Sequence, residues 1–211
     1  MDKFINRRAA GKVIAELLKK YANNEKAIIL ALPRGGVPVA YEIAQALSLP
    51  LDVFIVRKLG VPHQEELAMG AIATGNTIFL NKDIIQTLHI TPSQIEQVKL
   101  EEKSELLRRE LVYRGNRPFP TLQNKIVILV DDGIATGATM RAAILSIRAQ
   151  LPQKIVVAVP VAALDTCQEM QSMVDEMICP IRPGTFYAVG AWYEEFSQTT
   201  DEEVFQLLKK G

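Results

Sequence analysis

The sequence predicts an α/β fold in which helices flank a doubly wound, mainly parallel sheet. Short, continuous runs of aliphatic and β-branched residues alternate along the chain with segments of helical periodicity. Such runs are typical of strands that are buried on both faces, as the strands of parallel sheets are. Two of the runs also lead through a glycine-containing loop into a helix. In doubly wound sheets such loops meet at the carboxyl ends of the strands, near the point where the strand order reverses.

The first part of the chain supplies two helices and two strands. Asn6 is a suitable N-cap for the first helix. The apolar face of this helix is predicted to contain Val13, Ile14, Leu17, Leu18 and Tyr21. A buried strand over 27–32 follows, and a loop at 33–36 joins it to a helix over 38–47. A second strand is predicted over 51–56.

Residues 59–75 are predicted to form an irregular loop, because no period is sustained there. The residues that interrupt regular structure in this stretch are Gly60, Pro62, Gly70 and Gly75. Loops of this length in a compact domain are usually lids or surface excursions with a function. A short strand over 77–80 is predicted to follow.

A long helix is predicted from Thr91 to about Tyr113. Thr91 provides the N-cap, Pro92 takes the first helical position, and Gln94 completes a capping box. This helix would be on the order of 30 Å long. Its apolar stripe is narrow, so we expect either a solvated helix packed along one edge or a subunit contact, which is compatible with a homodimer. The helical insertion is expected to span about 91–117.

The most specific motif lies in the middle of the chain. A predicted strand over 126–130 ends in two adjacent carboxylates, Asp131 and Asp132. The small-residue loop 135–139 follows, and a helix begins within it and ends before Pro152. The N–H groups at a helix start have no partner within the helix, so they are suited to binding an anion such as phosphate.

Side chains in and before this loop narrow the kind of ligand. Gly137 allows the backbone to approach an anion closely, and the hydroxyls of Thr136 and Thr139 add donors. Two acids beside a phosphate site would repel an anion unless the ligand also carries hydroxyls or a divalent cation. A ribose 5-phosphate combines a diol and a phosphate in one molecule. The motif therefore predicts a sugar-phosphate site.

Three other interpretations of the motif are weaker. Val-Asp-Asp after a buried strand also opens receiver domains, where the acids collect magnesium, but there it lies near the start of the domain and lacks the Thr-Gly-x-Thr loop. A Walker phosphate loop is excluded because no Gly-Lys-Ser/Thr follows the strand. An ordinary strand-to-helix turn could carry glycine and threonine, but it would not need two acids before it.

The loop after the first strand offers a second anion site. Pro33-Arg34-Gly35-Gly36 joins that strand to the next helix, and Arg34 adds a fixed positive charge. Alone, this sequence is a weak signal, because many turns resemble it. The loop becomes informative together with the later motif, because two anion sites flanking one crevice would suit a ligand with phosphate at one end and diphosphate at the other.

The C-terminal part begins with regular elements. A strand is predicted over 154–161, a helix over 167–174 with Asp165 as its N-cap, and a short strand over 176–179. The tail over 180–211 is expected to form a small hood.

Aromatic residues are concentrated in this tail: Phe186, Tyr187, Trp192, Tyr193 and Phe196. We expect Phe186 and Phe196 to pack in the core, and Trp192 or Tyr193 to stack on a flat ring. Thr200 or Asp201 is predicted to cap a last helix that runs through Leu208.

Composition excludes several classes of protein. With 211 residues, the chain suits a single α/β domain over 1–211. Its formal net charge is zero, so binding to nucleic acid or to an anionic membrane is not expected. Cys167 and Cys179 have neither zinc-ligand spacing nor a disulfide pattern, which predicts reduced thiols in a cytoplasmic protein. No signal region and no membrane-spanning run is apparent.

The segment from Ile126 to Thr139 resembles the phosphoribosyl-diphosphate (PRPP) motif of type I phosphoribosyltransferases, namely an apolar strand, Asp-Asp and a Thr-Gly-x-Thr loop. The resemblance implies magnesium-dependent transfer of phosphoribose from PRPP to a nucleobase or related nitrogen, with release of diphosphate. The same fold could instead serve as a PRPP sensor that regulates a partner without turnover. The order of motifs matches over most of the chain, but only this segment is highly specific.

The resemblance also implies roles for individual residues. Asp131 and Asp132 would bind the ribose hydroxyls and take part in holding Mg2+, mostly through ligand oxygens and water. The 5-phosphate loop would be Ala135, Thr136, Gly137, Ala138 and Thr139. The diphosphate loop would be Arg34, Gly35 and Gly36, and the catalytic residues would be Asp131, Asp132, Arg57 and Lys58. The hood would supply Trp192 or Tyr193 as the base contact.

Overall fold

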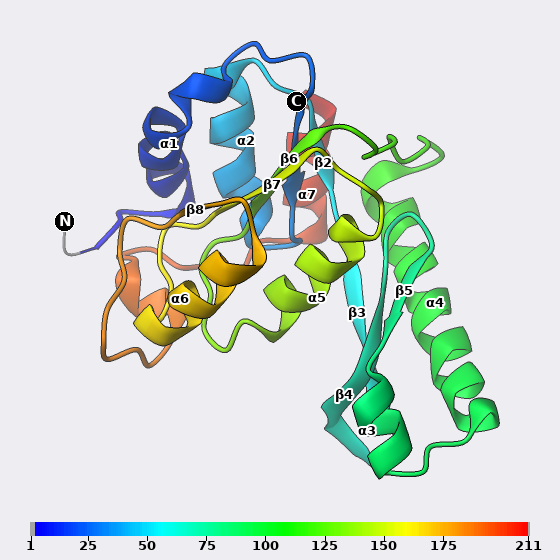
Figure 1. Ribbon diagram of the computed structural model, residues 1–211. Helices are drawn as coiled ribbons and strands as arrows, with labels where there is room; N and C mark the ends of the chain where they lie inside the picture. The colour runs from blue at the N-terminus through cyan, green and yellow to red at the C-terminus, as the bar shows by residue number, and fades with distance from the viewer. Residues whose placement is uncertain (1–2, 211) are drawn as a thin grey trace.

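A five-stranded parallel sheet lies at the centre of the structure, a computed structural model that describes residues 3–210 (Figure 1). In spatial order its strands are β2 (Leu51–Val53), β1 (Ala27–Ala31), β6 (Ile126–Val130), β7 (Lys154–Ala158) and β8 (Glu176–Ile178). All neighbouring pairs are parallel. The strand order reverses between β1 and β6, where doubly wound sheets bind their ligands. The predicted doubly wound sheet is confirmed.

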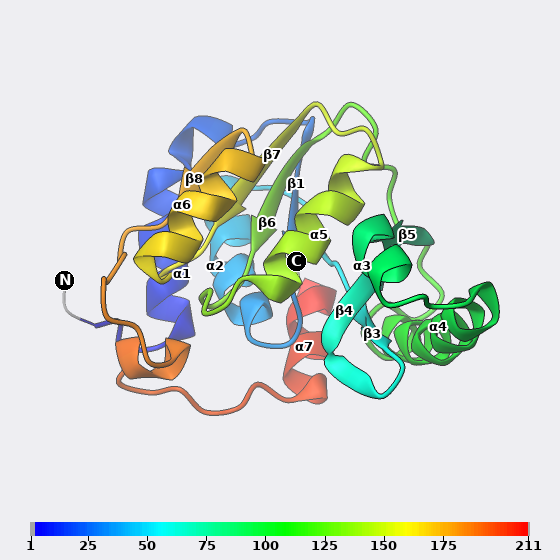
Figure 2. The same cartoon turned by 60° about the horizontal axis from the view of Figure 1, so that its bottom comes forward.

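Helices cover both faces of this sheet (Figures 1 and 2). One face carries α1 (Arg7–Leu17), α2 (Gly36–Leu47) and α7 (Asp201–Lys210), and the other carries α5 (Ala138–Arg148) and α6 (Leu164–Met173). Successive side chains of a strand point to opposite faces. Ile29 of β1 is therefore buried in the core with α2, whereas Leu30 is buried in the core with α5.

The N-terminal helices form where they were predicted, with small shifts. Asn6 caps α1 by accepting a hydrogen bond from the backbone N–H of Ala9 at 3.0 Å. On the predicted apolar face, Leu17 is exposed instead of buried, and Tyr21 lies in the short 3₁₀ helix η1 (Lys19–Tyr21) after α1. Helix α2 begins at Gly36, two residues before the predicted start.

The C-terminal elements also differ from prediction at their ends. Helix α6 begins at Leu164, so Asp165 lies in its first turn and is not the N-cap. Strand β7 ends at Ala158, before Pro160, which has no backbone N–H to donate to a neighbouring strand. Of the two predicted caps of α7, Thr200 is the one whose hydroxyl accepts from the backbone N–H of Glu203, at 3.1 Å.

The prediction of an irregular loop over 59–75 is wrong, because this segment forms most of a β-hairpin. A second, antiparallel sheet contains β3 (Val56–Val61), β4 (Gln64–Ala73) and β5 (Thr77–Leu80). Gly70, which suggested a loop, lies within β4, where a Cβ would be 2.3 Å from the carbonyl oxygen of Phe79. Glycine there allows two strands to approach closely, and the hairpin turns at His63 with a φ of 65°.

Helix α4 (Pro92–Arg114) confirms the predicted long helix and packs on this second sheet. The Thr91–Gln94 capping box forms in both directions. The short helix α3 (Lys82–Thr87), capped by Asn81, precedes α4 and was not predicted. Together β3 to α4 form an insertion that projects from the parallel sheet (Figure 1), so the insertion is larger than the predicted 91–117.

Arg114 fastens the C-terminal end of α4 to the parallel sheet. Its side chain is buried and donates to Asp52 of β2 at 3.1 Å and to the carbonyl oxygen of Val53 at 3.1 Å. The Arg114 guanidinium also lies 4.9 Å from the ring centroid of Phe119. A buried ion pair with a further hydrogen bond holds its geometry well, because both charges have partners.

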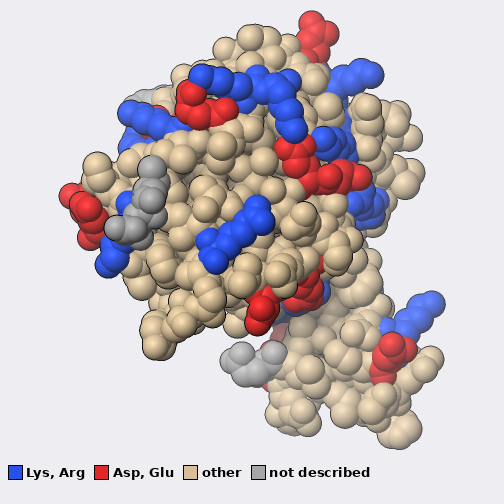
Figure 3. Space-filling model, turned by 60° about the vertical axis from the view of Figure 1, so that its left-hand side comes forward, with Lys and Arg blue, Asp and Glu red and all other residues tan. Residues whose placement is uncertain are grey.

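The thiols and part of the surface can be described directly. Cys167 and Cys179 are free and buried. Within residues 3–210, no helix is both long and apolar enough to cross a membrane. On the face shown in Figure 3, basic and acidic side chains are interspersed.

Candidate functional site

The loops after β1 and β6 lie directly against each other at the point where the strand order reverses. A Cβ added to Gly35 would lie 2.1 Å from Oδ2 of Asp132, and one added to Gly36 would lie 2.9 Å from Cα of Asp131. Neither glycine has a positive φ, so close approach is what requires glycine here. The structure therefore brings together the acids that were predicted to bind ribose and the glycines that were predicted to bind diphosphate.

The two carboxylates differ in their surroundings. Oδ1 of Asp131 accepts from the backbone N–H of Asp132 at 2.8 Å. Burial raises the pKa of Asp131 well above its usual range, and the adjacent charge of Asp132 raises it further. Burial also raises the pKa of Asp132, whereas the hydrogen bond and positive charge of Arg7 lower it. Burial is the larger effect, so the pKa of Asp132 stays raised, but Arg7 offsets part of that rise.

Arg7 was not predicted as part of the site. Its Nε donates to Oδ2 of Asp132 at 2.8 Å, and another guanidinium nitrogen donates to the carbonyl oxygen of Ser197 at 2.6 Å. The guanidinium lies 3.9 Å from the ring centroid of Phe196. The first helix and the C-terminal tail therefore meet at the second acid, although Phe196 was predicted to be in the core and is partly exposed.

Tyr193 supports the acid pair from the tail. Its hydroxyl donates to the backbone carbonyl oxygen of Asp132 at 2.5 Å, and its ring packs between Phe4 and Phe196. Burial raises the pKa of Tyr193. The prediction that Tyr193 stacks on a base is corrected by this placement, because its ring is enclosed and its hydroxyl is engaged.

Trp192 is half-buried and stacks on Phe186 with ring centroids 6.5 Å apart. Phe186 is therefore packed, but it is not fully buried as predicted. The role of Trp192 as a base contact stays a prediction.

The predicted 5-phosphate loop has the geometry of an anion-binding helix start. Gly137 is the N-cap of α5 with a φ of 78°, a left-handed conformation that glycine adopts without strain. Within residues 3–210, no capping side chain accepts a hydrogen bond from the backbone N–H groups at the start of α5. Thr136 and Thr139 are exposed, while the hydroxyl of Thr166 donates to the carbonyl oxygen of Ala135 at 2.9 Å and fixes the loop.

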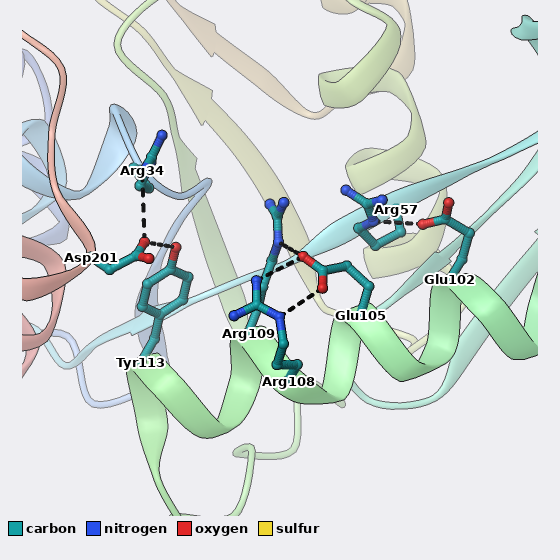
Figure 4. A network of polar contacts seen from close by, with 8 residues as sticks. All are labelled: Arg34, Arg57, Glu102, Glu105, Arg108, Arg109, Tyr113 and Asp201. Atoms are coloured by element: carbon teal, nitrogen blue, oxygen red, sulfur yellow. Dashed lines mark hydrogen bonds and ion pairs between the residues drawn. The ribbon is translucent and has the colours of Figure 1, made fainter.

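The basic residues predicted to face diphosphate lie in β3 and in the loop after β1. Arg57 of β3 is paired with Glu102 of α4 at 2.6 Å (Figure 4). Lys58 lines a hollow of about 210 Å³ that also includes Ala138 at the start of α5. Arg34 is 3.8 Å from Asp201 at the start of α7. The structure thus places Lys58 in the same hollow as Ala138 of the predicted 5-phosphate loop, and Arg57 against an acid.

A metal held by protein alone does not fit this site. Within residues 3–210 no group of three or more histidine, cysteine, aspartate or glutamate side chains could hold an ion. The two carboxylates at 131 and 132 fit a magnesium ion that takes most of its ligands from substrate oxygens and water.

Residues 3–191 match the family model described as a phosphoribosyl transferase domain. The chain belongs to this family. It is 41% identical over 211 residues to proteins from two strains of Mycobacterium tuberculosis that carry the provisional name phosphoribosyl transferase. All of this chain is covered in those matches, but it spans only 47% of the length of either relative. The sequence-based assignment to this family is confirmed.

Solved structures agree with the fold. The chain resembles the crystal structure of TT1426 from Thermus thermophilus with a TM-score of 0.88 and 38% identity, over 99% of this chain and 98% of that one. It also resembles the AQ2163 protein from Aquifex aeolicus with a TM-score of 0.50 and 13% identity, over 87% of this chain and 78% of that one. The second likeness concerns the fold alone.

Proposed function

We propose that this protein transfers the 5-phosphoribosyl group from PRPP to a nucleobase or related nitrogen, with magnesium, and releases diphosphate. The observation that carries the proposal is the contact between the glycines of the loop after β1 and the acids of the loop after β6. A ligand bound where these loops meet would face carboxylates and two amide-rich loops at once. PRPP has a diol, a phosphate and a diphosphate to match them.

The binding roles follow from the chemistry of each group. Carboxylate oxygens of Asp131 and Asp132 accept hydrogen bonds from the ribose hydroxyls. Backbone N–H groups at the start of α5 donate to the 5-phosphate, and those of the loop at 34–36 donate to the diphosphate. Arg7 and Tyr193 hold Asp132 in place, because one donates to its carboxylate and the other to its backbone carbonyl.

In the reaction, the bond between C1 of the ribose and the diphosphate oxygen breaks, and a bond from C1 to the acceptor nitrogen forms. The electron pair of the broken bond leaves with diphosphate, and the acceptor nitrogen gives up a proton to water or buffer. Negative charge therefore grows on the leaving group, so positive groups at that end stabilise the transition state. Arg34, Arg57 and Lys58 are the proposed sources of that charge, and Arg57 must leave Glu102 to act.

Magnesium would neutralise diphosphate charge and would be held in part by Asp131 and Asp132. The raised pKa of Asp131 reflects burial and the adjacent charge of Asp132, which the positive charge of Arg7 offsets only in part. A cation beside the pair would favour the ionised form of both acids.

Other properties of the protein belong to the same proposal. Trp192 of the hood would contact the acceptor, and the protein would work in the cytoplasm as one domain over 1–211. The interspersed charge on the face shown in Figure 3 and the formal net charge of zero support a small-molecule substrate over nucleic acid. A homodimer through α4 is compatible with the exposed Leu100, Leu107 and Leu111.

The proposal is tested by incubating the full chain with magnesium, PRPP labelled in the diphosphate, and a panel of nucleobases and other amines. Acceptor-dependent release of labelled diphosphate is the expected result, and it should disappear in Arg57→Ala if Arg57 reaches the leaving group. The matched control is Arg148→Ala, because Arg148 is equally basic but pairs with Asp175 at the other end of α5. Tight PRPP binding without release for any acceptor would contradict transfer and would support the sensor alternative.

A further inference from the structure

A basic cavity of about 400 Å³ lies beside the loop after β1 and is separate from the acid pair. It is lined by Pro33, Arg34, Arg108, Arg109, Tyr113 and Asp201. Three of these six residues are arginines, and they come from two segments, the loop after β1 and the last turns of α4 (Figure 4). The insertion therefore brings its own positive charge to the edge of the proposed diphosphate loop.

The two arginines of α4 share one acid. Glu105 accepts from Nε of Arg108 at 2.7 Å and from Nε of Arg109 at 2.7 Å. These contacts lower the pKa of Glu105 to about 2. A guanidinium has five N–H donors, so sharing one carboxylate leaves each arginine with further donors for another partner. Glu105 fixes the two side chains but does not use up their hydrogen-bonding capacity.

Arg34 is also incompletely paired. Its contact with Asp201 is long, at 3.8 Å, whereas Asp201 accepts a short hydrogen bond from the hydroxyl of Tyr113, at 2.6 Å. Burial and that hydrogen bond raise the pKa of Tyr113 to about 12, so Tyr113 stays a neutral donor. Asp201 is thus held by Tyr113, and among the described residues the long contact with Asp201 is the ion pair that Arg34 makes, so its guanidinium can donate to an anion in the cavity.

The charge balance of the cavity favours an anion. Three guanidinium groups face the carboxylates of Glu105 and Asp201, which leaves one positive charge in excess. Guanidinium groups bind phosphate oxygens through paired hydrogen bonds, and several of them together suit a group that carries more than one negative charge. An ordinary solvated helix face would not place a third arginine, from a distant loop, against the pair on α4.

We propose that this cavity binds an oxyanion of the phosphate class, held by Arg34, Arg108 and Arg109. The anion is either the diphosphate end of PRPP or a free phosphate that acts as an effector. The first source rests on the proposed function, and the second does not. In both cases α4 is a ligand-binding element of this chain as well as a structural insertion.

The test is calorimetric titration of the full chain with inorganic diphosphate and with inorganic phosphate, without PRPP or acceptor. When Arg108 and Arg109 are both replaced by alanine, the affinity for whichever anion binds should fall about tenfold. This is the loss expected for a charge-assisted hydrogen bond. Glu105→Gln should tighten binding, because it removes the competing carboxylate but leaves the arginines. Thermal unfolding followed by circular dichroism checks that each variant is folded.

Matched controls come from the same helix. Lys99 pairs with Glu96 in the way that the arginines pair with Glu105, and it lies about 15 Å along the helix from Arg109. Lys99→Ala and Glu96→Gln should leave anion affinity unchanged. The inference is wrong if native protein binds neither anion, if the double alanine variant binds as tightly as native protein, or if Lys99→Ala loses as much affinity.

Further measurements distinguish the two sources of the anion and test the cavity independently of the proposed function. If the double alanine variant loses affinity for PRPP and diphosphate alike, the cavity receives the substrate. If phosphate still binds to PRPP-saturated protein through the same arginines, the cavity is an effector site. The variant with Asp131→Asn and Asp132→Asn should keep its affinity for inorganic diphosphate. If this variant no longer binds PRPP, the loss is then due to the acid pair and not to the cavity.

Discussion

Oδ2 of Asp132 accepts a hydrogen bond from Nε of Arg7 at 2.8 Å, across 125 positions of the sequence. The two side chains are mostly shielded from solvent, at 14% and 12% exposure, so water screens their charges only partly. The first helix thus tunes the acid that is proposed to hold ribose.

Replacing Arg7 by methionine should move the pH dependence of PRPP binding upward. Arg7 lowers the pKa of Asp132, so its loss raises that pKa, and protonation then removes the negative carboxylate at a higher pH. When PRPP affinity is measured from about pH 5 to pH 9, the loss of affinity on the acidic side should begin at a higher pH in Arg7→Met than in native protein. Arg8→Met is the control, because Arg8 pairs with Glu42 and not with the site. Superimposable profiles for native protein and Arg7→Met would refute the coupling.

Gly35→Ala should weaken PRPP binding and reduce stability by about 1–3 kcal/mol, because the new methyl group would overlap Oδ2 of Asp132. Calorimetry and urea unfolding measure the two effects. Gly184→Ala is a matched control, since a Cβ there meets nothing within 4 Å and the backbone is not left-handed. Wild-type affinity in Gly35→Ala would show that the two loops are not in contact in solution.

Arg114→Ala should destabilise the protein by about 3 kcal/mol, because it leaves Asp52 charged and almost buried without its partner. The free energy of unfolding from urea titration is the readout. Arg148→Ala removes an ion pair that is largely exposed on both sides and should cost less than about 1 kcal/mol. Equal losses in the two variants would argue that Arg114 does not anchor the insertion to the sheet.

The parallel sheet and its helices could be predicted because each element carries its own signal. Strand β6 reads as an unbroken aliphatic, mostly β-branched run, and α4 has a full capping box with proline at its start. The β3–β4 hairpin could not be recognised, because Gly60 and Gly70 within its strands look like turn residues. The need for glycine appears only when the strands are paired, because a Cβ on Gly60 would lie 2.9 Å from the carbonyl oxygen of Glu65 and one on Gly70 would lie 2.3 Å from that of Phe79.

The acids and glycines of the site could be predicted for a similar reason, since each lies within one short motif. The roles of Arg7 and Tyr193 could not be predicted, because they arise from contacts with Asp132, which lies far from both in the sequence. No local pattern distinguishes Arg7 from the neighbouring Arg8, although the side chain of Arg8 pairs with a different acid, Glu42. Likewise, the position of Tyr193 in an aromatic cluster suggested stacking, whereas its burial and hydroxyl contact decide its role.

The most direct measurement is calorimetric titration of PRPP, with magnesium, into native protein and into the variant that carries both Asp131→Asn and Asp132→Asn. The asparagines keep the size of the side chains but remove the negative charge, so the variant should stay folded by circular dichroism. PRPP should bind native protein, and its affinity for the variant should fall at least about a hundredfold, as expected when two charged hydrogen-bond acceptors are lost. An unchanged Kd in the folded variant would contradict the assignment of the acid pair as the ribose site.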